Sequence, residues 1–328
     1  MTTMVLAIGG NSLIRPGETG TVAGQAANAR RIAAEVVRLV RQGYRIVLTH
    51  GNGPQVGAEL LLSERAAGQI PAHPLDFCDA STQGEMGYLL QQALENEMSR
   101  EGLRVPVVTI VTQCVVSLDD PAMSRPTKPV GPFYNEAEAG ERRRKFGWTI
   151  VEDAHRGFRR VVPSPQPLEI VELEAIERLV RSGVLVIACG GGGIPVARVD
   201  GNLKGVEAVI DKDLTSALLA SKLRAELFVI ATDTDFVYLN YGKPSQQPIH
   251  RIDKQQLEAW ARAGQFAPGS MGPKIEAVLE FLCSGGREAI VTRCDSIAAS
   301  VEGSAGTHIV PNRERLQPAA PAQREFAA

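Results

Sequence analysis

Short apolar runs rich in β-branched residues alternate along the chain with longer segments in which apolar side chains recur at helical spacing. Between the first two runs, residues 26–43 place Ile32, Val36 and Val40 on one face of a predicted helix that ends in charged residues and a glycine. Strands that alternate with helices of this length are typical of a mostly parallel sheet with helices on both faces. The predicted strands cover residues 4–8, 45–49, 105–111, 184–188, 227–231 and 288–292.

A segment of about residues 118–168, rich in proline and charged residues, interrupts this alternation. We interpret it as an inserted, protruding subdomain at the edge of the sheet. The pattern therefore predicts an α/β fold, with an open, mostly parallel sheet between helices and one insertion. Residues 313–328 contain no apolar face and are predicted to form a disordered tail.

The composition is that of an ordinary globular protein. With 328 residues, of which 44% are hydrophobic, the chain can form one large α/β domain or two smaller ones. A net charge of −2 gives no overall reason to expect nucleic acid or an anionic membrane as a partner. No apolar run approaches the roughly 20 residues of a membrane helix, and the first residues lack the features of a signal peptide. We therefore expect a cytoplasmic protein.

The cysteines and histidines give no sign of a metal site. The five cysteines are far apart and form no CxxC pair, and the five histidines show no HxH or HExxH spacing. We expect reduced thiols and no metal held by the protein alone.

Glycine-rich loops follow three of the predicted strands. The carboxyl ends of parallel strands lie at one edge of a sheet, where backbone N–H groups and helix N-termini bind phosphate or carboxylate. One such loop could be no more than a tight turn, but three at the same edge favour an anionic ligand. Their residues are Gly9, Gly10, Asn11, then Gly51, Asn52, Gly53, and finally Gly190, Gly191, Gly192, Gly193.

Two familiar nucleotide signatures are absent. The sequence contains no GxxxxGK[ST], because its single Gly-Lys pair, Gly242-Lys243, is followed by Pro244. The run "GGGGIP" lacks the third glycine of GxGxxG. A P-loop NTPase and a dinucleotide oxidoreductase are therefore disfavoured.

Three lysines occupy constrained positions. Lys128 lies between prolines, Lys212 opens a predicted helix, and Lys274 follows Pro273, which we expect at the first position of another helix. A lysine near a helix N-terminus is electrostatically unfavourable unless an anion is close, although a solvated surface position is the alternative. Phosphoryl transfer needs such cations. We expect Asp213 to hold the ammonium group of Lys212.

Taken together, the blocks "GGNSL", "HGNGPQVG", "PTKPVGPFY", "CGGGGIPV", "GVEAVIDKD" and "FAPGSMGPKIEA" resemble the carbamate kinases, which have the amino-acid kinase fold. The similarity extends from about residue 3 to 310, and its specific blocks are 126–134, 205–213 and 266–276. Glycine loops alone would also match acetylglutamate, uridylate or aspartate kinases. The lysine-bearing proline block separates carbamate kinases from these relatives.

The resemblance implies reversible transfer of the ATP γ-phosphoryl group to carbamate, which gives carbamoyl phosphate and ADP. In this family the reaction is often run towards ATP synthesis in arginine or purine catabolism. It also implies Mg²⁺ bound with ATP or ADP, and a homodimer that needs neither nucleic acid nor a membrane as a partner. Residues 1–223 would form the carbamate and phosphoryl half, and residues 224–312 the nucleotide-binding half.

By the same resemblance, each motif has an expected role. The catalytic residues would be Lys128, Lys212, Asp213 and Lys274. The phosphoryl group and carbamate would contact Gly9, Gly10, Asn11, Gly51, Asn52, Gly53, Gly190, Gly191, Gly192 and Gly193. The nucleotide would contact Asp233, Tyr241, Met271, Gly272, Pro273 and Lys274.

Two alternatives remain, and two positions depart from the family pattern. The alternatives are a related kinase for another small acid, such as an acetylglutamate-type kinase, and a non-catalytic nucleotide-binding sensor. Ser12 stands where alanine is expected, and His155 where glycine is common.

The basic residues between 141 and 160 are interpreted as a solvated face, and residues 82–98 as a helix that packs in the core or at a dimer interface.

Overall fold

The computed structural model describes residues 1–15, 17–152 and 157–312, so His155 and the predicted tail 313–328 lie outside the described residues. Its largest sheet has eight strands in the order β15-β17-β16-β12-β1-β2-β9-β3. Neighbouring strands are parallel except for β16 and β17, which are antiparallel. The strands are β1 (Thr3–Ile8), β2 (Arg45–His50), β3 (Val107–Thr109), β9 (Leu185–Ile187), β12 (Leu227–Thr232), β15 (Arg251–Asp253), β16 (Glu288–Arg293) and β17 (Thr307–Val310).

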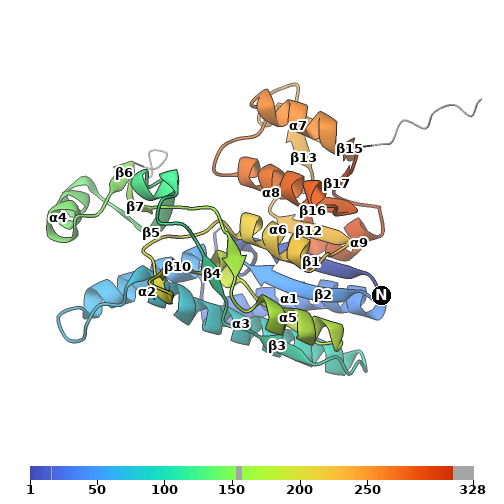
Figure 1. Cartoon of the computed structure of the whole chain (residues 1–328), viewed down its shortest axis with the longest axis horizontal. Helices are drawn as coiled ribbons and strands as arrows, with labels where there is room; N and C mark the ends of the chain where they lie inside the picture. Colours follow the sequence, from blue (N-terminus) through green and yellow to red (C-terminus); the bar gives the residue numbers. More distant parts are fainter. Residues whose placement is uncertain (16, 153–156, 313–328) are drawn as a thin grey trace, which may run out of the picture.

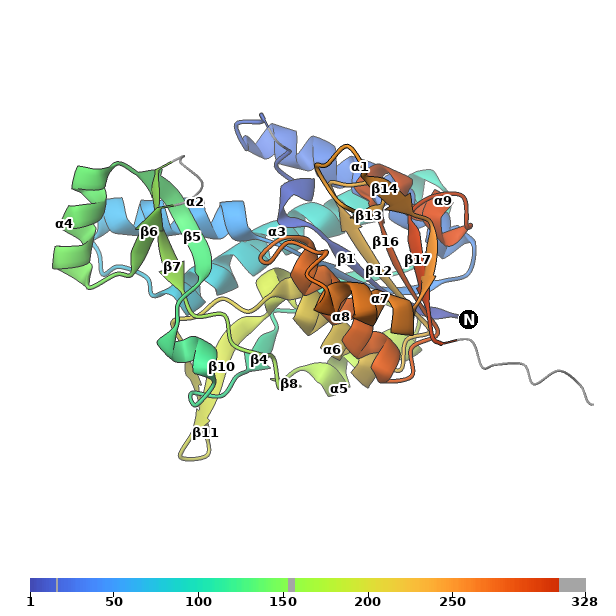
Figure 2. The same cartoon turned by 90° about the horizontal axis from the view of Figure 1, so that it is seen from above.

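Helices cover both faces of this sheet (Figures 1 and 2). Alternate residues of a strand point to opposite faces, so Val5 and Ala7 of β1 pack into one hydrophobic cluster while Met4 and Leu6 pack into the other. On the face of Met4, the helices are α1 (Val22–Arg41), α3 (Leu75–Arg100) and α9 (Ile297–Val301). On the face of Val5, they are α5 (Leu173–Arg181), α6 (Lys212–Lys222), α7 (Lys254–Arg262) and α8 (Met271–Cys283).

The predicted α/β fold with a mostly parallel sheet is confirmed. All six predicted strands belong to the large sheet, although the run at 105–111 contributes only Val107–Thr109. The sequence pattern missed β15 and β17, whose sequences RID and THIV contain no continuous apolar run of the kind that predicted the other strands.

Smaller sheets extend this core at the carboxyl ends of the strands. One has the order β11-β10-β4-β8, and another pairs β13 with β14. Among the described residues, no helix combines the length and apolar character needed to cross a membrane. The strands are β4 (Gln113–Val115), β8 (Glu169–Ile170), β10 (Ile194–Val199), β11 (Asn202–Gly205), β13 (Val237–Leu239) and β14 (Gln247–Ile249), and short 3-10 helices lie at Gly10–Ser12, Pro121–Ser124, Gly190–Gly192 and Cys294–Ser296.

The interrupting segment contains a three-stranded sheet and a helix that protrude from the core (Figure 1, left). Val130 and Val162 of this sheet pack against Val56 and Leu60 of α2 (Gly53–Ala66). The small sheet therefore rests on α2 and, within the described residues, forms no hydrogen-bonded extension of the large sheet, which differs from the expected place at the sheet edge. Its elements are β5 (Lys128–Tyr134), α4 (Glu136–Phe146), β6 (Ile150–Glu152) and β7 (Phe158–Val162).

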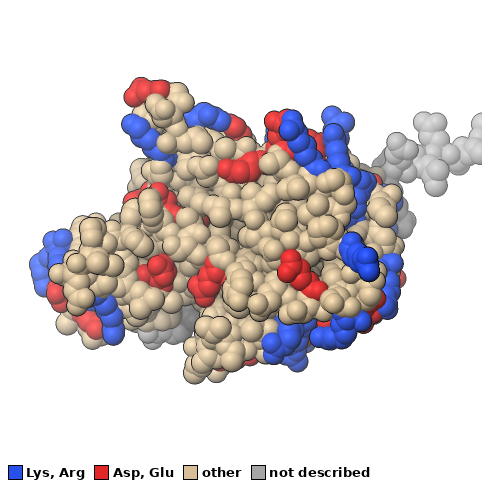
Figure 3. All heavy atoms as spheres, turned by 90° about the horizontal axis from the view of Figure 1, so that it is seen from below, with Lys and Arg blue, Asp and Glu red and all other residues tan. Residues whose placement is uncertain are grey.

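Charge is distributed over the surface without a single dominant patch on the face shown in Figure 3. Basic side chains gather at the outer end of the protruding unit, where Arg143, Arg144 and Lys145 of α4 are exposed. This exposure agrees with the expected solvated face for that part of the basic segment.

Candidate active site

Loops from the carboxyl ends of β1, β2 and β12 meet the protruding unit around a cavity of about 730 Å³. A parallel sheet brings these loops together because its strands all end at one edge. The three predicted lysines reach this cavity from β5, α6 and α8. Of the other predicted residues, those that line it are Gly9, Gly10, Asn11, Gly53 and Asp233.

The first two glycine loops touch backbone to backbone. A Cβ atom at Gly51 would lie 2.5 Å from the amide nitrogen of Gly10 and 3.3 Å from Cδ of Lys212. The amide of Gly51 donates a hydrogen bond to the carbonyl of Ile8 at 3.0 Å. Any side chain at Gly51 would force the loops apart, so this glycine sets the distance between the two loops and Lys212.

A buried aspartate joins two of the lysines. The carboxylate of Asp213 accepts hydrogen bonds from Lys212 and, at 3.1 Å, from Lys274. Helix α6 begins at Lys212, as expected, whereas α8 begins at Met271. The expectation that Pro273 opens that helix was therefore wrong by two residues, and Lys274 still lies in the first turns.

Electrostatics keep Asp213 and Lys274 ionised. Burial alone would raise the pKa of Asp213, but Lys212 and Lys274 outweigh it and lower that pKa to about 2. Burial alone would likewise lower the pKa of Lys274, but Asp213, with Asp211 and Asp233, raises it. At neutral pH the cavity therefore presents fixed positive charge before any ligand binds.

The run of four glycines has a packing role that the sequence did not suggest. Gly191, Gly192 and Gly193 have φ values of 69°, 103° and 87°, which disfavour any side chain. A Cβ atom at Gly190 would lie 2.6 Å from the ring of His50, and one at Gly192 2.6 Å from the carbonyl of Ile210.

These glycines also use their own N–H groups. The amides of Gly192 and Gly193 donate to the carbonyls of Cys189 and Gly190. Among the described residues that line the site cavity, none comes from this loop. Close packing and backbone conformation therefore give the run a structural role, and its contact with the phosphoryl group or carbamate stays a prediction.

Asn52 also points away from the cavity. Its side-chain amide is buried and donates to Asp79 and, at 3.0 Å, to Thr82. Burial raises the pKa of Asp79 to about 7, and burial lowers the pKa of neighbouring His50 to about 4. The glycine run packs on this buried polar group, since a Cβ atom at Gly191 would overlap both Asn52 and Asp79.

The predicted nucleotide residues are divided between two places. Asp233 lines the site cavity and accepts a hydrogen bond from Asn11 at 3.1 Å. Gly272 and Pro273 line an adjacent cavity of about 720 Å³ between α7 and α8, and Met271 begins α8 beside it. Tyr241 is 66% exposed and does not line the site cavity.

Two charged residues at the site were not among the predicted site residues. Asp211 caps α6 and pairs with Lys128 at 2.7 Å, and Arg159 of β7 lines the cavity. Arg159 belongs to the segment interpreted as a solvated face, which was wrong at this position. The departure at Ser12 is accommodated because its buried hydroxyl lies 2.9 Å from the sulfur of Cys294.

Comparison with known proteins identifies close relatives over almost the whole chain. The sequence profile described as the amino acid kinase family matches residues 2–293. A carbamate kinase from Thermococcus kodakarensis is 46% identical over 315 residues, covering 94% of this chain and 99% of that protein. The structure of a carbamate kinase from Giardia lamblia bound to AMP-PNP is similar with a TM-score of 0.90 and 42% identity, covering 95% of this chain and 99% of that one.

A more distant structural relative shares the fold alone. An N-acetylglutamate synthase from Neisseria gonorrhoeae has a TM-score of 0.56 and 16% identity, and covers 95% of this chain and 60% of that chain.

We expect Gly192→Ala to destabilise the protein by at least about 2 kcal/mol, because it combines an unfavourable φ with overlap on the Ile210 carbonyl. Gly201→Ala is the matched control: its φ is 78°, but a Cβ atom there would meet open space. Strain alone should cost this control about 1 kcal/mol. Midpoints of urea unfolding would measure both losses, and equal losses would contradict the packing role.

Asp79 should make the protein less stable as pH rises. Its pKa is about 7 in the folded protein and near 4 in the unfolded chain, so its stabilising contribution is complete below pH 4 and is lost as pH rises towards 7. Asp79→Asn cannot titrate. The difference in melting temperature, wild type minus Asp79→Asn, should therefore fall between pH 5 and 8, and a constant difference would show that Asp79 does not titrate there.

Proposed function

The chain belongs to the amino acid kinase family and, within it, to the carbamate kinases, and from that premise we propose which of its residues carry the reaction. The reaction is the reversible transfer of the γ-phosphoryl group of ATP to carbamate, which gives carbamoyl phosphate and ADP. One observation carries the assignment of residues: Lys128, Lys212 and Lys274 line the same cavity as the first two glycine loops.

The chemistry needs charge and position more than acid–base catalysis. The attacking carbamate oxygen is already ionised, so no general base has to remove a proton. Two anions must meet, and positive groups fixed around them stabilise the charge of the transition state. Lys212 and Lys128 would contact the phosphoryl group during its transfer, and Lys274 would contact the phosphates of the nucleotide. Asp213 stays ionised and orients Lys212 and Lys274.

Backbone groups would hold the small substrates. Gly9, Gly10 and Asn11 line the cavity beside Lys212, and this supports their role at the transferred phosphoryl group. Gly53 begins α2 and lines the cavity, and the positive end of that helix supports a role for Gly53 on the carbamate side. Gly51 would act through the loop spacing and Asn52 through its buried hydrogen bonds, without direct contact by their side chains.

The nucleotide would enter beside α8. Gly269, Ser270 and Lys274 line the cavity near Asp233, which is the carboxylate on that wall. Among the described residues, no group of three His, Cys, Asp or Glu side chains could hold a metal ion. Mg²⁺ would therefore take most of its ligands from the phosphates and water, with Asp233 as a fitting oxygen donor, and would neutralise phosphate charge when bound.

At the level of the whole molecule, we assign residues 1–223 to the carbamate and phosphoryl half and residues 224–312 to the nucleotide half.

We also propose a homodimer. Phe77 and Tyr88 of α3 are 59% and 62% exposed, and large exposed aromatic side chains on one helix support an interface there.

The first test is ATP formation from ADP and carbamoyl phosphate in the presence of magnesium. We expect rapid formation by the wild type and its collapse in Lys128→Ala. Lys145→Ala, which removes an exposed lysine from the same protruding unit, should stay active. No ATP from a wild type that still binds nucleotide would contradict the substrate assignment, and acetylglutamate would be the next acid to assay.

Lys212→Ala should lower turnover by about 10² or more while nucleotide affinity changes little, because the lost contact belongs to the transition state. Lys222→Ala, at the other end of α6, is the matched control and should leave turnover unchanged. Steady-state kinetics and nucleotide titration separate the two effects. Unchanged turnover in Lys212→Ala would remove Lys212 from the mechanism.

A further inference from the structure

Two ion pairs join the protruding unit to the segment between β11 and α6. Lys128 of β5 pairs with Asp211, and Arg160 of β7 pairs with Glu207, each at 2.7 Å. Each pair thus links a different strand of the small sheet to residues 206–211. Because the two ion pairs have the same length and join the same two parts of the chain, one pair can serve as a control for the other.

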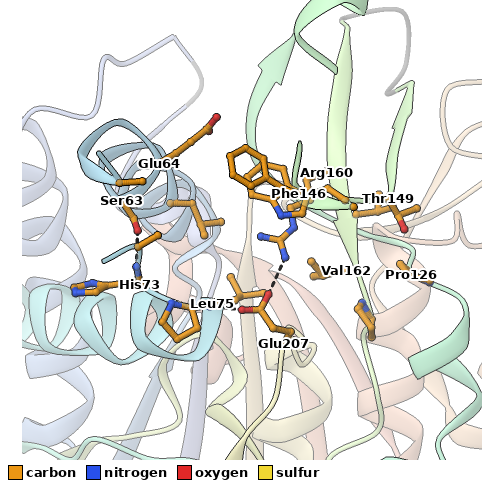
Figure 4. A pocket seen from close by; sticks show the side chains of 18 residues that line it. Ser63, Glu64, His73, Leu75, Pro126, Phe146, Thr149, Arg160, Val162 and Glu207 are labelled. Carbon is orange, nitrogen blue, oxygen red and sulfur yellow. Dashed lines mark hydrogen bonds and ion pairs between the residues drawn. The ribbon is translucent and has the colours of Figure 1, made fainter. Parts of the chain in front are cut away.

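The two pairs face different cavities. Lys128 lines the site cavity, as does Arg159. Arg160, the next residue along β7, lines a second cavity of about 580 Å³, where its guanidinium lies 4.4 Å from the centre of the Trp148 ring. Figure 4 shows Arg160 reaching across this second cavity to Glu207. Each pair therefore docks the unit, but only one of them ends at the proposed catalytic cavity.

A hydrogen bond to the backbone holds the side chain of Asp211 in place. Its Oδ1 accepts a hydrogen bond from the amide of Asp213 at 2.9 Å and so caps α6, while Oδ2 accepts from Lys128. The Asp211 side chain is only 14% exposed, whereas that of Lys128 is 35% exposed. A flexible lysine thus meets a carboxylate whose position the helix N-terminus fixes.

We propose that Asp211 is a positioning residue, which holds the ammonium group of Lys128 at the place where the phosphoryl group is transferred. The proposal rests on the function proposed above for Lys128. A lysine side chain has four rotatable bonds and loses considerable entropy when fixed in one geometry. Asp211 fixes it before substrates arrive, so the benefit belongs to turnover and not to nucleotide binding.

The test compares Asp211→Asn with Glu207→Gln in the ATP-forming direction. Asn keeps an oxygen for the α6 cap but removes the charge that holds Lys128. Gln likewise keeps an oxygen for the amide of Leu75, which donates to Glu207 at 2.8 Å, but removes the charge that holds Arg160. We expect Asp211→Asn to lower kcat roughly tenfold or more with little change in the KM for ADP, and Glu207→Gln to stay within about twofold of wild type.

A double-mutant cycle then asks whether Asp211 acts through Lys128. In a Lys128→Ala background, Asp211→Asn should lower kcat by less than about twofold, because the group that it positions is already gone. Equal losses in both backgrounds, or an equal loss in Glu207→Gln, would overturn the proposal in favour of a general effect on helix capping or docking. An unchanged or raised kcat in Asp211→Asn would also overturn it.

Two controls keep failure of folding and failure of the underlying function apart. If Asp211→Asn lowers the melting temperature strongly, Asp211→Ser provides the same test, because serine is a good N-cap but cannot form the ion pair. Full activity in Lys128→Ala would instead show that the function proposed for Lys128 is wrong. Loss of activity in Lys128→Ala with full activity in Asp211→Asn would overturn this inference alone.

Discussion

The carboxylate of Asp213, buried between the ammonium groups of Lys212 and Lys274, is the interaction on which the site depends. An isolated charge in this position would be strongly destabilising, whereas a charge with two hydrogen-bonded partners is tolerated. Asp213 in turn stabilises the two lysines, which lie near helix N-termini where positive charge is unfavourable. Because α6 carries Asp213 and α8 carries Lys274, the buried group also fixes these two helices relative to each other.

The sheet and the glycines supply the rest of the geometry. Parallel strands deliver their loops to one edge, but the distance between loops depends on what lies between them. Gly51 leaves no atom between the first two loops, and Gly190 to Gly193 let a third loop pack on His50, Asn52 and Asp79. The cavity is thus lined in part by the backbone of the first two loops and by lysine side chains, and a layer of buried polar residues supports the loops from behind.

The sequence allowed prediction of those features whose cause lies within a short stretch of chain. Continuous apolar runs predicted six strands of the large sheet, and a lysine beside an aspartate at a helix start indicated Lys212 and Asp213. Contacts between distant segments could not be read in this way. Nothing in the glycine run says that an Ile210 carbonyl lies opposite Gly192, and the short alternation of β7 that turns Arg159 inwards is hidden in a charged segment.

Asp211 pairs with one lysine of the cavity and Asp213 with the other two, and this pairing bears on the direction of the reaction. Both aspartates lie at the start of α6, and together they contact all three lysines of the cavity before substrate binds. Charge that is fixed in advance stabilises the transition state without reorganisation during the reaction. In the proposed mechanism one transition state serves both directions, so these lysines would accelerate ATP formation and carbamoyl phosphate formation by the same factor. The concentrations of substrates and products relative to the equilibrium constant, which a catalyst does not change, would therefore decide which way the phosphoryl group moves.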